Sequence, residues 1–274
     1  MYNLKIIKSG DRIEFYRYNN YVVNNKGQEV IGEVFKDNEG RRGKDNIDKD
    51  TKECNKERAR ATTLNNARNN IIRLIKANPE MQTFITLTFR EESNYKDSKK
   101  LLNNFFTKLR RDYSNLKYLW VLECGSLKGR LHYHVLTNIS IDIKLSSSKE
   151  KKNKEHKALE SSFSKKYWKH GFIDIRQLKQ ENNTNIALYV SAYITKDLID
   201  KKLEGYRVYG YSNKTLNKPI IETLYTRESL DQLLEEYKGK YNITYSNSYE
   251  VGYSKGIKEY KGNVLYMDLL KKGE

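Results

Sequence analysis

The amino-acid sequence predicts an α+β protein with a ferredoxin-like or RRM-like βαββαβ core, in which helices pack on one face of an antiparallel sheet. The first observation that predicts this class is the order β-α-β-β-α-β-α of strand-like and helix-like segments between residues 82 and 200. The second is the strand-like character of both ends of the chain, which predicts β-rich N- and C-terminal extensions. Abundant tyrosine, isoleucine and leucine, with only two prolines, are typical of a folded core domain.

Residues 1–50 are expected to form an N-terminal β-hairpin extension and a basic linker. Residues 2–35 hold two strand-turn-strand patterns, with turns at 9–11 and at 24–27. The stretch 36–51 is charged, contains glycine and has almost no apolar residue, so we expect an exposed linker there.

The core domain is expected over residues 51–215. A helical pattern begins near residue 53 and ends at Asn78-Pro79, and residues 82–89 then read as a buried strand rich in Thr, Ile and Phe. The same two periodicities predict the remaining elements: a helix at 95–112, strands at 117–124 and 130–137, a flexible basic stretch at 144–157, a helix at 158–169, a strand after Gly171 and a helix at 184–200.

Residues 216–274 form a tyrosine-rich C-terminal extension. Tyrosines recur every fourth residue from 237 to 253, and the glycines and asparagine between them argue against a helix. In a strand, every fourth residue falls on the same face. We therefore predict a strand or hairpin over 240–253 with a turn near 246–248, whose tyrosines pack against the protein, with stacking on bases as the alternative.

The charge of the chain predicts a polyanionic partner. Its 52 Lys and Arg residues against 35 Asp and Glu residues give a formal net charge of +17, and nucleic acid is the leading candidate. No apolar run is long enough to span a membrane, and charged residues interrupt the N-terminus, so neither a membrane protein nor a secretory signal is expected. The two cysteines, Cys54 and Cys124, cannot build a disulfide framework, which indicates a cytoplasmic location.

A His-Tyr-His motif is the first candidate for chemistry. His132 and His134 would leave the same face of a strand about 7 Å apart, a spacing that suits two ligands of one divalent ion. Because two histidines bind Mg²⁺ or Mn²⁺ poorly without an oxygen donor, a third ligand is needed. Glu123, at the end of the preceding strand, is the candidate. The alternatives are a pair of hydrogen-bonded strand histidines and an ordinary strand-end glutamate.

A helix with two tyrosines is the second candidate. Tyr189, Tyr193 and Lys196 cluster within about 60° of the helix surface, away from the apolar stripe that would pack on the sheet. A tyrosine oxygen is a poor nucleophile near neutral pH, with a pKa of about 10, unless a cation lowers the cost of ionisation. The histidines, the glutamate and this helix together suggest metal-assisted phosphoryl transfer to tyrosine, which leaves a phosphotyrosine ester and a free 3′-hydroxyl.

These motifs resemble those of HUH endonucleases. The segment GRLHYHVL resembles their His-hydrophobic-His motif, QTFITLTF resembles the first motif of rolling-circle replication initiators, and YVSAYITKD resembles their third, tyrosine-bearing motif. The segments WKHGFIDI and GYRVYGYSNKTLNKP look similar to Rep proteins of Gram-positive plasmids and related phages. The three motifs occur in the family's order across about 82–200.

The resemblance implies the HUH endonuclease fold over 51–215 and an enzyme that starts rolling-circle replication by nicking and joining single-stranded DNA through a 5′-phosphotyrosine. It implies that His132, His134 and Glu123 hold Mg²⁺ or Mn²⁺. Tyr193 matches the nucleophile, Tyr189 the first tyrosine of two-tyrosine relatives, and Lys196 the lysine of their Tyr-x-x-Lys motif. One departure is Ala192, where relatives often carry lysine, and it leaves a two-tyrosine mechanism open. The extra glycine-bearing loop between Glu123 and His132 likewise leaves the third ligand open.

The implied partners are single-stranded or hairpin origin DNA and, because no P-loop motif occurs, a helicase and polymerase of the host. We expect basic segments at 36–60, 144–157 and 201–218 to bind phosphates, and the expected DNA contacts are Arg41, Arg42, Lys128, Arg130 and Lys214. A conjugative relaxase or single-strand transposase would use the same chemistry. A non-enzymatic RRM-like nucleic-acid-binding protein, with structural histidines and a sheet of stacking aromatics, is the alternative from another class.

Overall fold

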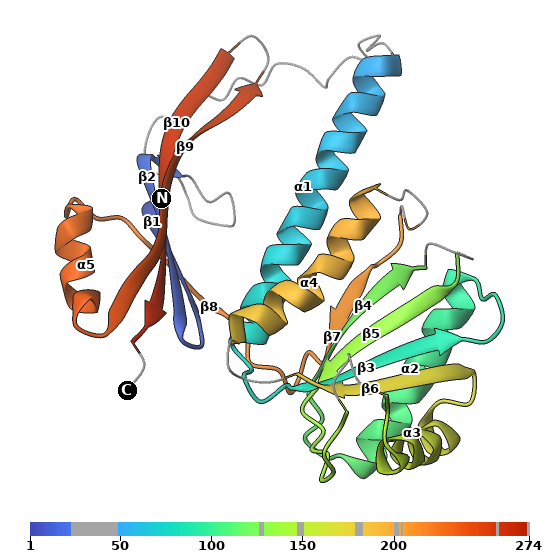
Figure 1. Cartoon of the computed structure of the whole chain (residues 1–274). Helices are drawn as coiled ribbons and strands as arrows, with labels where there is room; N and C mark the ends of the chain where they lie inside the picture. Colours follow the sequence, from blue (N-terminus) through green and yellow to red (C-terminus); the bar gives the residue numbers. More distant parts are fainter. Residues whose placement is uncertain are drawn as a thin grey trace. The chain divides into compact units, whose positions relative to one another are not determined.

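The computed structural model describes residues 1–22, 49–125, 129–146, 151–178, 183–199, 203, 205–255 and 258–272. The chain divides into two units (Figure 1): unit 1 comprises Met1–Asn55 and Pro219–Glu274, and unit 2 comprises Lys56–Lys218. The two terminal extensions, which the sequence analysis treats separately, thus belong to one unit.

Unit 2 is built on an antiparallel sheet. Its described strands lie in the order β6-β3-β5-β4-β7, with the bounds β3 Thr83–Phe89, β4 Tyr118–Cys124, β5 Leu131–Thr137, β6 Gly171–Gln177 and β7 Tyr209–Tyr211. The helices are α1 Lys49–Lys76, α2 Tyr95–Asp112, α3 Lys154–Tyr167 and α4 Asn183–Ile199. The predicted α+β class and the order β-α-β-β-α-β-α are confirmed. Helix α3 begins four residues before the predicted start, inside the stretch expected to be flexible.

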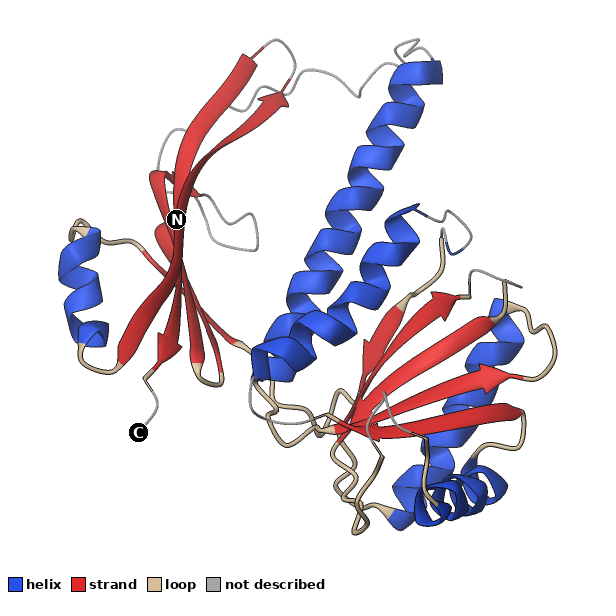
Figure 2. Cartoon of the chain, in the orientation of Figure 1, coloured by secondary structure: helices blue, strands red, loops and turns tan. Residues whose placement is uncertain are grey.

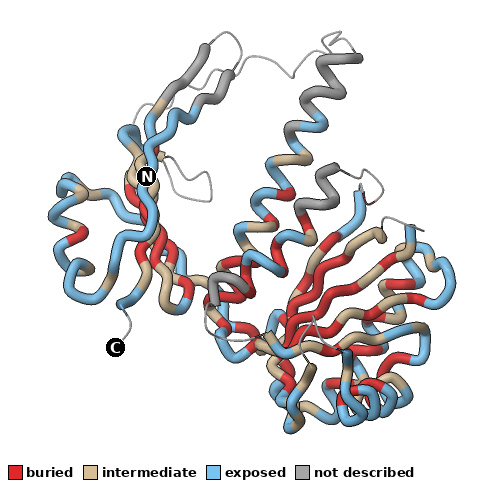
Figure 3. Tube along the Cα trace, in the orientation of Figure 1, coloured by how far each residue is buried: buried red, intermediate tan, exposed pale blue. Residues whose placement is uncertain are grey.

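Helices cover both faces of this sheet, whereas the sequence analysis expects them on one face (Figure 2). Alternate strand residues such as Tyr133 and Trp120 point toward α2, where Tyr133 Oη lies 3.0 Å from Ser98 Oγ. The opposite face packs against α4, whose residues Ala187 and Val190 are fully buried. Figure 3 shows the resulting core as a buried band through the strands. Helix α4 packs on the second face because its apolar stripe needs a surface to cover it.

Unit 1 is a second antiparallel sheet, in which the described strands lie in the order β8-β1-β2-β10-β9. Their bounds are β1 Tyr2–Ser9, β2 Arg12–Val22, β8 Ile220–Leu224, β9 Tyr241–Lys255 and β10 Lys258–Lys271. The turn predicted at 9–11 joins β1 to β2, and Gly10 adopts the left-handed φ of 62° that this turn requires. Helix α5, Leu230–Lys238, begins with a capping box and covers one face, where the rings of Tyr237 and Phe15 meet edge to face.

The C-terminal strand corrects one prediction. β9 runs without a break from Tyr241 to Lys255 and pairs with β10 along that length, so there is no turn at 246–248. Pairing with a partner strand overrides the local turn preference of Ser-Asn-Ser. A register shift near Thr244 also divides the tyrosines: Tyr241 packs with the α5 side of the sheet, whereas Tyr245 and Tyr249 are exposed.

The second predicted turn, at 24–27, and most of the linker at 36–51 lie outside the described residues. None of the helices in the described part of the chain is long and apolar enough to cross a membrane.

Candidate functional site

The register of the unit 2 sheet brings the predicted ligands to one face. His132 and His134 project from the same side of β5, which lies between β3 and β4. Glu123 on β4 stands directly opposite His132. The predicted approach of all three side chains is therefore what the strand pairing produces.

Two threonines of β3 orient the imidazoles. Thr88 stands opposite His132 and Thr86 opposite His134, and the hydroxyls lie 3.0 Å and 3.2 Å from the respective Nδ1 atoms. Because a hydroxyl can either donate or accept, each threonine is compatible with either tautomer of its histidine. Both rings are therefore fixed through Nδ1, which leaves Nε2 for a further partner.

The Nε2 atom of His134 faces Glu123, with 2.6 Å between Nε2 and Oε2. His132 is half-buried, and burial lowers its pKa, with the charge of His134 acting in the same direction. A lowered pKa keeps the imidazole of His132 neutral near pH 7, which is the form that binds metal ions.

Gly125 keeps open the space beside His132. A Cβ atom at this position would lie 2.8 Å from His132 Nε2 and 3.2 Å from Cδ2. The backbone of Gly125 does not have a positive φ, so the glycine is required here by space and not by backbone conformation. The sequence analysis notes Gly125 only as a loop residue.

Helix α4 places a tyrosine directly on this cluster. The ring of Tyr193 stacks on that of His134, with 3.8 Å between centroids and 23° between planes. Phe84 of β3 lies beside both rings. Tyr193 Oη donates a hydrogen bond of 2.7 Å to Tyr189 Oη. Burial raises the pKa of Tyr193, and the bond to Tyr189 adds to this, so the phenolate is disfavoured unless a cation is present.

The two tyrosines lie to the side of the apolar stripe, as predicted. Val190 and Ile194 are fully buried, whereas Tyr193 is half-buried and Tyr189 is exposed. Lys196 belongs to α4, but the position of its side chain lies outside the described residues.

Asp174 is a neighbour that the sequence analysis missed. It stands opposite Thr86 on β6, and its negative charge, like that of Glu123, contributes to the raised pKa of Tyr193. Burial alone would raise the pKa of Asp174, but hydrogen bonds from Arg176 and Lys152 outweigh it and lower the pKa. Its acidic side chain in a strand with alternating polarity is the only signal that the sequence offers.

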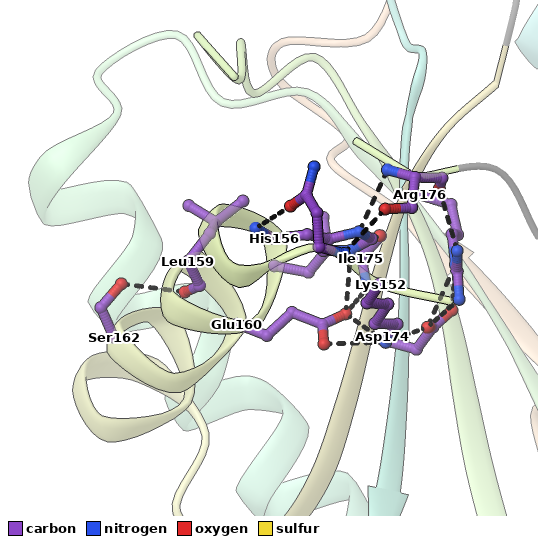
Figure 4. Close-up of polar contacts among 10 residues, drawn as sticks. Lys152, His156, Leu159, Glu160, Ser162, Asp174, Ile175 and Arg176 are labelled. Atoms are coloured by element: carbon purple, nitrogen blue, oxygen red, sulfur yellow. Dashed lines mark hydrogen bonds and ion pairs between the residues drawn. The ribbon is translucent and has the colours of Figure 1, made fainter. Parts of the chain in front are cut away.

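A polar network behind Asp174 ties β6 to α3 (Figure 4). Lys152 Nζ lies 2.5 Å from Asp174 Oδ1 and 2.6 Å from Glu160 Oε1. Glu160 accepts the backbone N–H of Ile175, and the buried His156 contacts the carbonyl oxygen of the same residue through Nε2 at 2.9 Å. Helix α3 thus satisfies the outward backbone groups of this edge strand.

Of the predicted DNA contacts, Lys214 is exposed, and Arg130 is half-buried and close enough to His132 for its charge to affect the pKa of that residue. Arg41, Arg42 and Lys128 lie outside the described residues.

No group of three or more His, Cys, Asp or Glu side chains in the described part of the chain is arranged to hold a metal ion. The donor set nevertheless fits one by its chemistry, since two imidazoles and a carboxylate share one face of the sheet. The space that a Cβ of residue 125 would fill also lies at His132 Nε2. The direct contact between Glu123 and His134 accounts for the difference, because it joins two of these donors to each other.

Residues 82–198, which run from β3 into α4, match the model of a family described as replication-associated protein ORF2. This part of the chain belongs to that family, which indicates a role in replication. The match is consistent with the resemblance to rolling-circle replication initiators. No curated protein and no solved structure was found to match the chain.

Proposed function

We propose that this protein is an HUH endonuclease of the rolling-circle initiator type, which nicks and joins single-stranded DNA at a specific site. The observation that carries the proposal is the stack of Tyr193 on His134. It brings a helix tyrosine to the His-x-His pair across two segments that lie far apart in the sequence. The family match across the same residues supports a replication role.

The proposed reaction is transfer of a DNA phosphoryl group to tyrosine. Tyr193 Oη attacks the phosphorus of one phosphodiester, a bond from Oη to phosphorus forms, and the bond from phosphorus to the 3′ oxygen breaks. The proton that Oη gives up is balanced by the proton that the 3′ oxygen takes up. Because one phosphodiester replaces another, attack by a 3′-hydroxyl on the same phosphorus reverses the step and joins the strand.

Tyr189 positions the nucleophile by accepting its hydrogen bond. It is also the second tyrosine of a two-tyrosine mechanism, which would let the pair act in alternating cleavages. Its exposed side chain is accessible to a second strand. Lys196 is proposed to hold the phosphate or to stabilise the phenolate.

His132, His134 and Glu123 are the residues that would hold Mg²⁺ or Mn²⁺. The ion supplies positive charge at the scissile phosphate and lowers the cost of ionising the tyrosine. Thr86 and Thr88 orient the two imidazoles through Nδ1, so that each Nε2 is directed at the same region.

The sheet of unit 2 supports a ferredoxin-like core of the HUH type. Strand β3 lies between β5 and β6, and β4 lies beside β5, in a βαββαβ unit that contains α2 and α3. The substrates we propose are single-stranded or hairpin origin DNA, with a host helicase and polymerase extending the free 3′ end.

The experiment is incubation of the full chain with single-stranded oligonucleotides that contain a randomised segment, in the presence of Mn²⁺. A covalent protein–DNA adduct that survives denaturation, with one sequence enriched at its 5′ end, is expected. Tyr193→Phe should abolish the adduct, and replacing both His132 and His134 with alanine should do the same. An adduct at wild-type level in either variant would contradict the assignment.

The alternative, an RRM-like binding protein without enzymatic activity, predicts tight metal-independent binding and no adduct. It requires a sheet face that is open to bases. Helix α4 covers much of that face of the unit 2 sheet, with Val190 and Ile194 buried beneath it. The geometry therefore favours the nuclease.

A further inference from the structure

Strand β9 lies at the edge of the unit 1 sheet. It pairs with β10 on one side, and none of the described strands pairs with its other side. An edge strand presents unpaired N–H and C=O groups, which can accept a further strand. Four large apolar or aromatic side chains of β9 are more than a third exposed: Ile243 at 53%, Tyr245 at 53%, Tyr249 at 40% and Val251 at 43%.

The sequence of this edge is symmetric about Asn247. The segment Tyr-Ser-Asn-Ser-Tyr, residues 245–249, reads the same in both directions. Farther out, Ile243 mirrors Val251 and both are apolar. Such symmetry would suit a hairpin that folds back on itself at 246–248. Because β9 is one continuous strand, the symmetry is instead displayed along an open edge.

A symmetric edge is complementary to a second copy of itself. If two β9 strands run antiparallel with a two-fold axis at Asn247, Tyr245 of each copy stands opposite Tyr249 of the other. Ser246 likewise stands opposite Ser248. Directly opposed residues of an antiparallel pair share a face, so the tyrosines meet in two equivalent cross-strand pairs.

The charge of this edge fits the same partner. Residues 241–249 carry no charged side chain, although the chain has a net charge of +17 that repels a second copy elsewhere. Proteins usually protect open edges with charged residues or proline. The other edge strand, β8, follows that rule: Pro219 precedes it, and Glu222 forms an ion pair with Lys8 at 2.8 Å.

We propose that two copies of this protein associate through β9 and join their unit 1 sheets into one continuous sheet. Because the same edge is used on both copies, the association closes at two and leaves no free β9 edge for a third. The register shift near Thr244 interrupts regular pairing beyond Tyr245, so the interface is short and the dimer reversible. The inference uses no residue of the candidate nuclease site and does not depend on the proposed function.

Cysteine cross-linking tests the register of this pairing. Asn247→Cys is made in the full chain with Cys54→Ser and Cys124→Ser, and diamide serves as the oxidant of the two thiols. Asn247 faces its own copy at the two-fold axis, so an interchain disulfide is expected. Val251→Cys is the matched control on the same exposed edge, because its two copies would lie eight residues apart, or about 26 Å, in the paired strands. Equal cross-linking of the two variants, or none of either, would overturn the register.

Sedimentation equilibrium tests the association itself. The unmodified chain should show a concentration-dependent dimer. Asn247→Lys places two like charges face to face and should raise the dimer dissociation constant about tenfold or more. Asn247→Ser, which adds no charge, should stay close to the unmodified chain, and matching far-ultraviolet circular dichroism spectra would show that all three are folded. A chain that remains monomeric up to its solubility limit would overturn the proposal.

Discussion

Replacing Gly125 with alanine tests whether the space at His132 Nε2 is used. The new Cβ atom would lie 2.8 Å from Nε2, 3.2 Å from Cδ2 and 3.3 Å from the carbonyl oxygen of Arg130. Ordinary carbon contacts begin near 3.5 Å, so the imidazole must retreat by roughly half an ångström. Thr88 holds the other side of the ring at 3.0 Å, and the movement must therefore strain that hydrogen bond or rotate the ring.

The expected effect is on metal affinity more than on folding. Changes that misorient a ligand typically cost about 10- to 100-fold in metal affinity or activity. Because the backbone at Gly125 has no positive φ, alanine adds no conformational strain, and we expect a loss of unfolding free energy of about 1 kcal/mol or less.

The assay is the yield of covalent DNA adduct as a function of Mn²⁺ concentration, with direct calorimetric titration of Mn²⁺ as a second readout. Gly239→Ala is the control, since Gly239 has a helical φ of −67° and a Cβ there would meet nothing within 4 Å. If Gly125→Ala requires no more Mn²⁺ than the unmodified protein, His132 Nε2 is not a metal ligand and the reasoning fails.

Three other substitutions probe the site and its surroundings. Asp174→Asn should lower the free energy of unfolding at neutral pH, and its difference from the unmodified chain should shrink below about pH 4, because the lowered pKa of Asp174 confers stability only while the carboxyl is ionised; a difference independent of pH in urea titrations would contradict this. His156→Ala removes a buried ring that contacts Ile175 O and Ser146 N, and should cost about 2–4 kcal/mol in the same assay, whereas a loss below about 1 kcal/mol would show that the contacts matter little. Arg130→Ala and Lys214→Ala should each reduce the salt dependence of single-stranded DNA binding by about one unit of slope if they contact phosphates, and unchanged slopes would remove them from the interface.

The sequence was sufficient to predict the order of elements in unit 2 because each is long and strongly periodic. Strand β7 was missed, since three residues around Gly210 carry no periodicity. The joining of both termini in one sheet was also missed, because pairings such as that of β2 with β10 link segments more than two hundred residues apart. Local patterns contain no record of such distant partners.

Within the site, residue chemistry found His132, His134 and Tyr193 because these residue types are uncommon in strands and on helix flanks without a reason. Thr86 and Thr88 escaped notice, since threonine is an ordinary strand residue and only the pairing of β3 with β5 reveals its contact with a histidine. Gly125 escaped for a similar reason, because a loop glycine is explained by the turn until its distance from an imidazole is known.

The most direct test of the central claim is to identify the residue that carries the DNA after cleavage. Adduct formed by the full chain with Mn²⁺ is digested with trypsin and nuclease, and the nucleotide-bearing peptide, expected over residues 180–196, is fragmented in a mass spectrometer. The account predicts a phosphotyrosine-linked nucleotide on Tyr193 in the first cleavage. A nucleotide found only on Tyr189, or on a residue outside α4, would contradict it.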